Sequence, residues 1–162
     1  ESRGLGDVYK RQVFLYFPHR KLNFSITKRK AVIMLDFKKI LVPYDGSSHA
    51  KKALNQAISL AQCSDGAELY VATILNSTIP ADDDPDQVDM AEVEKLIPEN
   101  IPHKVLLEMG EPVPMLLYLA GEIGADLIIT GSRGRGALKS LFMGSVSSHL
   151  ASNVKCPILI IK

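Results

Sequence analysis

Strand and helix patterns alternate from Lys39 to Ile161, and this alternation narrows the possible folds more than any other feature. Short apolar runs are predicted as buried strands, and segments with apolar residues at three- and four-residue steps lie between them. Such an alternation predicts an α/β fold, an open parallel sheet with helices on both faces. The five predicted strands are Lys39–Pro43, Glu68–Leu75, His103–Met109, Asp126–Thr130 and Ile158–Ile161.

The predicted helices carry residues at their ends that start or stop helices. Serine side chains accept hydrogen bonds from first-turn amides, proline fits the first turn, and glycine permits a left-handed ending. The predicted starts and stops are Ser47 or Ser48 with Gly66, Met90 with Ile97 before Pro98, Pro112 with Gly124, and Gly144 for the last helix.

The first 33 residues do not share this pattern. Glu1–Gln12 shows no sustained helical or strand period and resembles translated sequencing-adapter read-through. We therefore predict one domain over residues 34–162, and a non-native or disordered extension over residues 1–33. The alternative for the extension is a basic arm that binds nucleic acid, because Lys28, Arg29 and Lys30 lie within it.

Charge and cysteine content exclude several classes of protein. The formal net charge is +1, which argues against a strong attraction to nucleic acid or to an anionic membrane. No apolar run is long enough to span a bilayer. Cys63 and Cys156 stand far apart and form no C-x-x-C pair. This argues against a disulfide framework or a zinc site and favours a reducing, cytoplasmic compartment.

A glycine-rich segment follows the fourth predicted strand, from Gly131 to Gly136, and a second group runs from Gly144 to Ser148. A Walker A loop is excluded because Ala-Leu, and not Lys-Ser or Lys-Thr, follows Gly136. The dinucleotide fingerprint is excluded because its third glycine is replaced by Lys139. No G-x-S-x-G motif occurs, which argues against an α/β-hydrolase.

The pattern that remains is Gly131-x2-Gly134-x9-Gly144-Ser145. Glycines after a strand let backbone approach a ligand, and a helix start offers free N–H groups and a favourable dipole to an anion. The hydroxyls of Ser145 and Ser147 add donors. The segment therefore predicts an anion site, with a glycine-rich turn of no binding role as the alternative.

The expected strand order places the segment that contains Asp45 next to the glycine-rich loop. If the order is 3-2-1-4-5, the first and fourth strands flank the point where the order reverses, which is where open α/β sheets bind ligands. Asp45 follows the first strand and Gly131 follows the fourth. We expect the two to face one crevice.

Three segments resemble the universal stress proteins: Lys38–Ser47, the glycine pattern, and Lys155–Ile161. The resemblance covers Asp36–Lys162, and the glycine pattern is typical of the family's ATP-binding branch. It implies a Rossmann-like, adenine nucleotide α-hydrolase-like fold that binds ATP with Mg²⁺. The nucleotide-binding positions it implies are Pro43, Tyr44, Asp45, Gly46, Ser47, Ile74, Thr130, Gly131, Ser132, Arg133, Gly134, Gly144, Ser145, Val146 and Ser147.

The resemblance also implies individual roles. The Asp45 carboxylate would accept from ribose hydroxyls, and the Ile74 backbone would read the adenine edge. Gly134 and the segment Gly144–Val146 would donate to the phosphates. Two interpretations are open for Arg133, Arg135 and Lys139: phosphate contact or solvation. Two are also open for Asp82–Asp84: contact with Mg²⁺ or an exposed loop. We expect surface or packing positions for His49 and His149.

The sequence also leads to expectations about oligomeric state and catalytic activity. Ile158–Ile161 would form an apolar edge strand, and family members dimerise there, so a homodimer is expected. The sequence offers no general base, nucleophile or metal cluster aimed at the γ-phosphate, so ATP hydrolysis would be slow at most. We expect a nucleotide-dependent regulatory protein. The alternatives are a dimerisation module without nucleotide and a nucleotide-dependent transferase, whose H-x-G-H, K-M-S-K-S and S-G-G-x-D-S signatures are absent.

Overall fold

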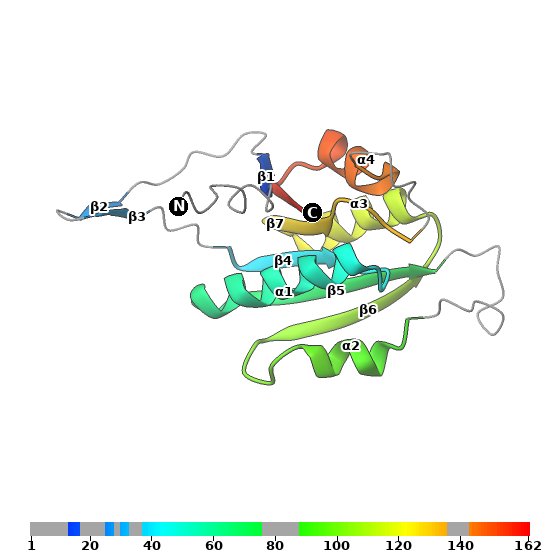
Figure 1. Ribbon diagram of the computed structural model, residues 1–162, viewed down its shortest axis with the longest axis horizontal. Coiled ribbons are helices and arrows are strands. Elements are labelled where there is room, and N and C mark those ends of the chain that lie inside the picture. Colours follow the sequence, from blue (N-terminus) through cyan, green and yellow to red (C-terminus); the bar gives the residue numbers. More distant parts are fainter. Residues whose placement is uncertain (1–12, 17–24, 28–29, 33–36, 76–87, 136–142) are drawn as a thin grey trace, which may run out of the picture.

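The computed structural model describes residues 13–16, 25–27, 30–32, 37–75, 88–135 and 143–162. Strands and helices alternate from β4 onward, as the sequence predicts (Figure 1). The elements in chain order are β1 Val13–Tyr16, β2 Ser25–Thr27, β3 Lys30–Val32, β4 Lys39–Pro43, α1 Ser48–Cys63, β5 Glu68–Leu75, α2 Met90–Leu96, β6 His103–Met109, α3 Pro112–Ile123, β7 Leu127–Gly131, α4 Ser145–Asn153 and β8 Ile158–Ile161.

One sheet organises the domain, with the strand order β1-β8-β7-β4-β5-β6. The five strands from β4 to β8 are parallel to one another. Counted from β4, their order is 3-2-1-4-5, so the predicted open five-stranded parallel sheet is confirmed. Strand order reverses between β4 and β7, whose carboxyl ends therefore lie side by side. β2 and β3 pair with each other in a separate two-stranded sheet.

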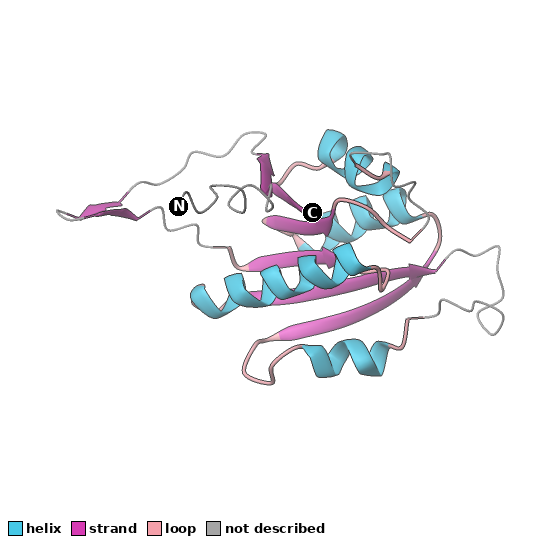
Figure 2. Cartoon of the chain, viewed as in Figure 1, coloured by secondary structure: helices cyan, strands magenta, loops and turns pink. Residues whose placement is uncertain are grey.

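Helices cover both faces of this sheet (Figure 2). Alternate residues of β4 separate the two cores, because successive side chains of a strand point to opposite faces. Ile40 and Val42 pack with α1 and α2, while Leu41 packs with α3 and α4. Each fully buried Ile or Leu stabilises the fold by roughly 2 kcal/mol relative to an exposed one. Among the described helices, none combines the length and apolar character needed to cross a bilayer.

The helix ends follow the predictions with small differences. The Ser47 hydroxyl accepts a hydrogen bond from the N–H of Ala50 at 3.1 Å, so Ser47 is the cap of α1. α3 ends at Gly124, which is left-handed with φ 66°. The prediction that Gly66 ends α1 is wrong, because the extended backbone of Ser64 ends the helix first; Gly66 is left-handed in the turn that follows.

The outer side of β8 differs from the sequence expectation. We expected Ile158–Ile161 to be an edge strand, but β1 pairs with it in antiparallel register, from Val13 opposite Ile161 to Tyr16 opposite Ile158. β1 lies on a short apolar run, Val13–Tyr16, in the segment that the sequence analysis assigns to an extension outside the domain. Whether that segment is native stays a prediction. In this structure β6 and β1 form the two edges of the sheet.

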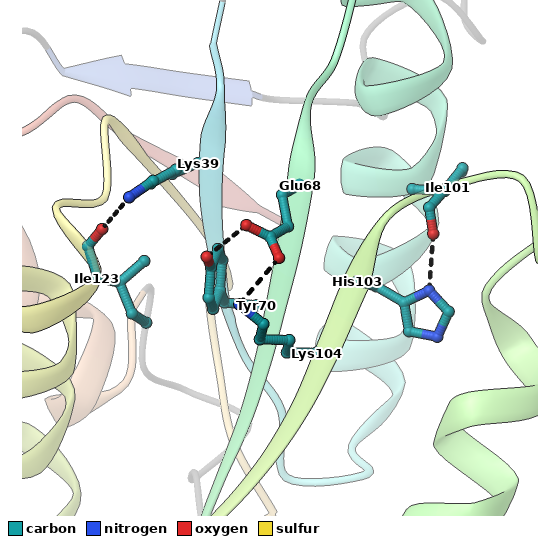
Figure 3. Close-up of polar contacts among 7 residues, drawn as sticks. All are labelled: Lys39, Glu68, Tyr70, Ile101, His103, Lys104 and Ile123. Atoms are coloured by element: carbon teal, nitrogen blue, oxygen red, sulfur yellow. Dashed lines mark hydrogen bonds and ion pairs between the residues drawn. The ribbon is translucent and has the colours of Figure 1, made fainter.

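Several polar side chains make contacts near the amino ends of β4, β5 and β6 (Figure 3). Glu68 accepts a hydrogen bond from the Tyr70 hydroxyl, and its other carboxylate oxygen lies 3.1 Å from Nζ of Lys104. The Tyr70 hydrogen bond lowers the pKa of Glu68, and the same contact raises the pKa of Tyr70. Lys39 Nζ donates to the carbonyl of Ile123 at 2.9 Å. In open parallel sheets, ligands bind at the opposite, carboxyl ends of the strands.

Candidate functional site

The loop after β4 and the loop after β7 meet at the point where strand order reverses. The Asp45 carboxylate joins them: Oδ1 accepts from the N–H of Ser47 at 3.0 Å, and Oδ2 accepts from the N–H of Arg135 at 3.2 Å. The Ser47 hydroxyl also lies 3.4 Å from the carbonyl oxygen of Arg133. The structure therefore brings together the two segments that the sequence predicted would converge.

Two glycines permit this close approach. A Cβ on Gly134 would lie 2.7 Å from Oδ2 of Asp45, so a side chain there would push the carboxylate away. Gly46 is left-handed, with φ 77°, and a Cβ on it would lie 2.6 Å from a guanidinium nitrogen of Arg135. The Arg135 side chain thus crosses the turn that carries Asp45.

Gly131 is a glycine for a different reason from the one the pattern suggests. A Cβ there would lie 2.7 Å from the carbonyl carbon of His49 and 2.9 Å from the backbone nitrogen of Ala50. The end of β7 thus packs directly on the first turn of α1. Packing against α1 is therefore enough to explain why this position requires glycine, without any ligand.

The start of α4 is the clearest donor group at the site. Its cap residue Gly144 makes no side-chain capping hydrogen bond. The first N–H groups of any helix have no acceptor within the helix, and here they belong to Gly144, Ser145, Val146 and Ser147. The N–H of Gly144 donates to the carbonyl of Ser132 at 2.7 Å. Gly144 was expected to donate to phosphate, but its N–H already donates to Ser132; among the described residues, the three amides that follow have no acceptor.

The backbone of Ser132 links β7 to the start of α4, while its side-chain hydroxyl has no partner among the described residues. Its carbonyl accepts from Gly144 and, at 3.2 Å, from the Ser147 hydroxyl, and its N–H donates to Ile161 at 2.7 Å. The side chain is 1% exposed, and among the described residues its hydroxyl has no hydrogen-bond partner. An unsatisfied buried hydroxyl is costly, so this group beside the start of α4 is a candidate for a ligand contact.

A third strand borders the same region. The N–H of Tyr44 donates to Ala72 at 2.8 Å, and the hydroxyl of buried Thr73 donates to the carbonyl of Tyr44 at 2.8 Å. β4 pairs with β5 only as far as Pro43 opposite Ala72, so β5 continues past it and Ile74 lies beside the turn after β4. The sequence reasoning missed Thr73, although it is the only serine or threonine in β5.

Charge at the site is mixed. Burial raises the pKa of Tyr44, and the carboxylate of Asp45 raises it further. Burial lowers the pKa of His49, and the nearby positive charge of Arg133 lowers it further. His49 is a packing residue, as predicted, since it contacts Gly131. Two arginine side chains and a helix start together make this end of the sheet suited to an anion.

Some predicted residues lie outside the description. Lys139 and Asp82–Asp84 belong to segments that the structure does not describe. In the described part of the chain, no three His, Cys, Asp or Glu side chains gather as a metal cluster would require. A depression of about 410 Å³ lies at the far end of the sheet, between the end of α1 and Asn100–Pro102. It holds none of the predicted site residues.

The sequence model of the universal stress protein family matches residues 36–162. The chain belongs to this family. It is 34% identical over 137 residues to the Thermus aquaticus "universal stress protein in QAH/OAS sulfhydrylase 3′ region", covering 78% of this chain and 99% of that protein. It is 31% identical over 162 residues to the stress response protein NhaX of Bacillus subtilis, covering 76% of this chain and 97% of that protein.

Solved universal stress protein structures share the fold. UspA from Lactobacillus plantarum superposes with a TM-score of 0.67 at 21% identity, covering 80% of this chain and all of that one. A universal stress protein in complex with cAMP gives a TM-score of 0.61 at 25% identity, covering 77% and 96%. A family protein from Arabidopsis thaliana with AMP bound gives a TM-score of 0.55 at 18% identity, covering 77% and 90%. The fold of this family therefore carries adenine nucleotides in some of its members.

Proposed function

We propose that this universal stress protein binds ATP, with Mg²⁺, at the carboxyl ends of β4 and β7, and acts as a nucleotide-dependent regulatory protein in the stress response. One observation supports the proposal above the others. The Asp45 carboxylate holds the loop after β7 at a hydrogen-bond distance of 3.2 Å, beside the start of α4, where the amides of Ser145, Val146 and Ser147 have no acceptor among the described residues. Polar groups for a sugar and donors for a phosphate chain thus share one site.

Each part of the nucleotide has matching groups. The amides of Ser145, Val146 and Ser147 suit the phosphates, since the start of α4 combines open donors with the positive end of the helix dipole. The unpartnered Ser132 hydroxyl adds a donor. Gly134 and Gly144 leave room for the phosphate chain.

The adenosine part of the nucleotide suits the side of the site formed by Asp45 and Ile74. The remaining lone pairs of the Asp45 carboxylate suit ribose hydroxyls, because a carboxylate accepts about four hydrogen bonds and two are already made. The backbone of Ile74, beyond the end of β4, suits the adenine edge. The relatives with cAMP and AMP support an adenine nucleotide as the ligand class.

Binding, and not catalysis, is the activity that these residues favour. Efficient phosphoryl transfer needs a group that positions the attacking water or hydroxyl. In the described part of the site the only carboxylate, Asp45, is bound to two backbone amides. We therefore propose slow ATP hydrolysis at most.

Calorimetric titration with ATP, ADP and AMP in the presence of Mg²⁺ tests this proposal. We expect saturable heat, and a melting temperature that rises with nucleotide concentration because ligand binds the folded state. No heat and no melting shift at millimolar ATP would favour a dimerisation module without nucleotide. Turnover above roughly 1 s⁻¹, the low end for enzymes, would favour a transferase or an efficient ATPase instead.

We also propose a homodimer through β8 and a cytoplasmic location. β8 accepts an antiparallel strand along its outer side, here β1, so a second copy would have to take the place of β1. Light scattering on the full chain and on a chain that starts at Met34 checks this: the shorter chain should be dimeric at micromolar concentration, and a monomer would contradict the proposal. The location is supported by Cys63 and Cys156, which form no disulfide.

A further inference from the structure

Two aspartates join the segments beside β4 and β7, one at each end of this strand pair. At the amino ends, Asp126 accepts from the N–H groups of Lys38 at 2.9 Å and Lys39 at 3.1 Å. At the carboxyl ends, Asp45 accepts from Ser47 and from Arg135, which is 90 positions away in the sequence. The contacts are of the same kind, but only those of Asp45 lie at the proposed nucleotide site.

The contact between Asp45 and Arg135 determines where the loop after β7 runs. Arg133–Arg135 belongs to no strand or helix, so side-chain contacts such as this one fix its path, together with the contact of the Ser47 hydroxyl with the Arg133 carbonyl oxygen at 3.4 Å. Gly134 lies so close to Oδ2 of Asp45 that a Cβ there would displace the carboxylate. On the other side of the same stretch, Ser132 holds Gly144 at the start of α4 at 2.7 Å. The carboxylate and the helix start therefore hold the loop from two sides.

A carboxylate beside a phosphate site needs an explanation of its own. Its charge repels phosphate, so on Coulomb grounds alone its neutralisation would strengthen ATP binding. An acceptor that fixes donors and backbone in the geometry the ligand requires has the opposite effect. The two explanations predict changes of opposite sign, which makes them separable by experiment.

We infer that Asp45 is a positioning residue for the phosphate-binding loop, acting through the N–H of Arg135 and not only through the sugar. This rests on the proposed function, since it concerns how the same site receives the phosphate chain. Asp45 keeps the stretch Arg133–Arg135 beside the start of α4 before ligand arrives. This part of its effect on binding is therefore independent of the ribose hydroxyls.

The test uses 2′,3′-dideoxy-ATP, which has the triphosphate and the base but neither ribose hydroxyl. We expect Asp45→Asn to weaken its binding about tenfold, the size of one lost hydrogen bond to a charged group. The asparagine oxygen can still accept from Ser47, but its NH₂ then faces the N–H of Arg135, donor against donor. An acceptor of ribose hydroxyls alone predicts no change, and simple charge repulsion predicts tighter binding; either result overturns the inference.

Asp126→Asn is the matched control. It removes the same kind of contact from the same strand pair at the far end, so it should lower stability while leaving the dideoxy-ATP affinity unchanged. Equal losses of affinity in the two variants would reduce the role of Asp45 to general stability and overturn the inference. If the wild-type protein binds neither ATP nor its dideoxy analogue, the proposed function itself fails.

A measurement on the ligand-free protein makes the inference testable without nucleotide. Amide hydrogen exchange followed by NMR should show the N–H of Arg135 exchanging at least about tenfold faster in Asp45→Asn than in the wild type. Asp126→Asn should leave that rate unchanged and speed the exchange of Lys38 and Lys39. An Arg135 rate unaffected by Asp45→Asn would show that the contact does not hold the loop.

Discussion

Gly131 and His49 are in direct backbone contact: a Cβ on Gly131 would lie 2.7 Å from the carbonyl carbon of His49. This contact joins the end of β7 to the first turn of α1. Ser47, the cap of α1, lies only two residues before His49, and Asp45 lies two residues earlier still. Packing at Gly131 thus sets the distance between the two loops of the candidate site.

We predict that Gly131→Ala lowers the free energy of unfolding by about 2–3 kcal/mol. The new methyl group would meet backbone atoms, which cannot turn aside as a flexible side chain can, so α1 or β7 must shift. Urea unfolding monitored by circular dichroism measures the change.

Gly121→Ala is the control for this substitution. Gly121 lies in α3, and a Cβ there meets nothing within 4 Å. Alanine is the better helix former, so this variant should gain roughly 0.5–1 kcal/mol. A Gly131→Ala protein as stable as the wild type would show that β7 and α1 separate easily.

The sequence predicted the strands well, because the pattern that marks a strand lies within that strand alone. The bounds of β4, β5, β6 and β8 agree with the apolar runs that predicted them. β7 runs from Leu127 to Gly131, one residue later at each end than predicted, and the side chain of Asp126, just before it, accepts hydrogen bonds from Lys38 and Lys39. The strand order 3-2-1-4-5 entered the sequence argument as a condition, and the sheet has that order.

What escaped prediction depends on contacts between distant segments. The glycine pattern indicated a loop that binds an anion, but it could not show that Gly131 packs on α1 or that the N–H of Gly144 is engaged by Ser132. Nor could it show that Asp45 holds Arg135. Residue type alone does not reveal which partner a carboxylate selects among the many amides of a folded chain.

We predict that Gly144→Asp weakens ATP binding roughly 100-fold. A carboxylate about 5 Å from a phosphate charge is repelled by about 3 kcal/mol at an effective dielectric constant of about 20. Gly144→Ala separates charge from bulk, since a Cβ there would lie 3.4 Å from Cα of Arg133 and needs only a small adjustment. Calorimetry on both variants decides: similar affinities for ATP would place the phosphates elsewhere.

Ser132→Ala should stabilise the ligand-free protein while weakening its binding of ATP. The hydroxyl is buried without a partner among the described residues, so its removal should raise the free energy of unfolding by about 1 kcal/mol. If a phosphate satisfies this hydroxyl in the complex, ATP affinity should fall roughly fivefold. Urea unfolding and calorimetry measure the two effects.

The comparison variant for Ser132 is Ser147→Ala. The single hydrogen of the Ser147 hydroxyl has two carbonyl acceptors within reach, Ser132 at 3.2 Å and Gly144 at 3.1 Å, so its loss should lower stability by about 1 kcal/mol. Destabilisation by both substitutions alike would mean that the Ser132 hydroxyl is satisfied within the folded chain.

His49 should make the protein less stable in mild acid. Burial and the charge of Arg133 hold the pKa of its imidazole below the ordinary value of 6.5. The unfolded chain therefore takes up the proton at a higher pH than the folded protein does. Stability from this group is complete above pH 6.5 and decreases as the pH falls from there toward the lower pKa of the folded state.

His49→Gln tests this pH dependence, because glutamine keeps a polar side chain but does not titrate. We expect the wild type to lose more stability than the variant between pH 7 and pH 5, measured as the fall in the urea midpoint at constant ionic strength. Added ATP should reduce the difference, since phosphate beside Arg133 offsets the positive charge that disfavours protonation of His49. Equal falls in the urea midpoint would show that His49 is as easily protonated in the folded protein as in the unfolded chain.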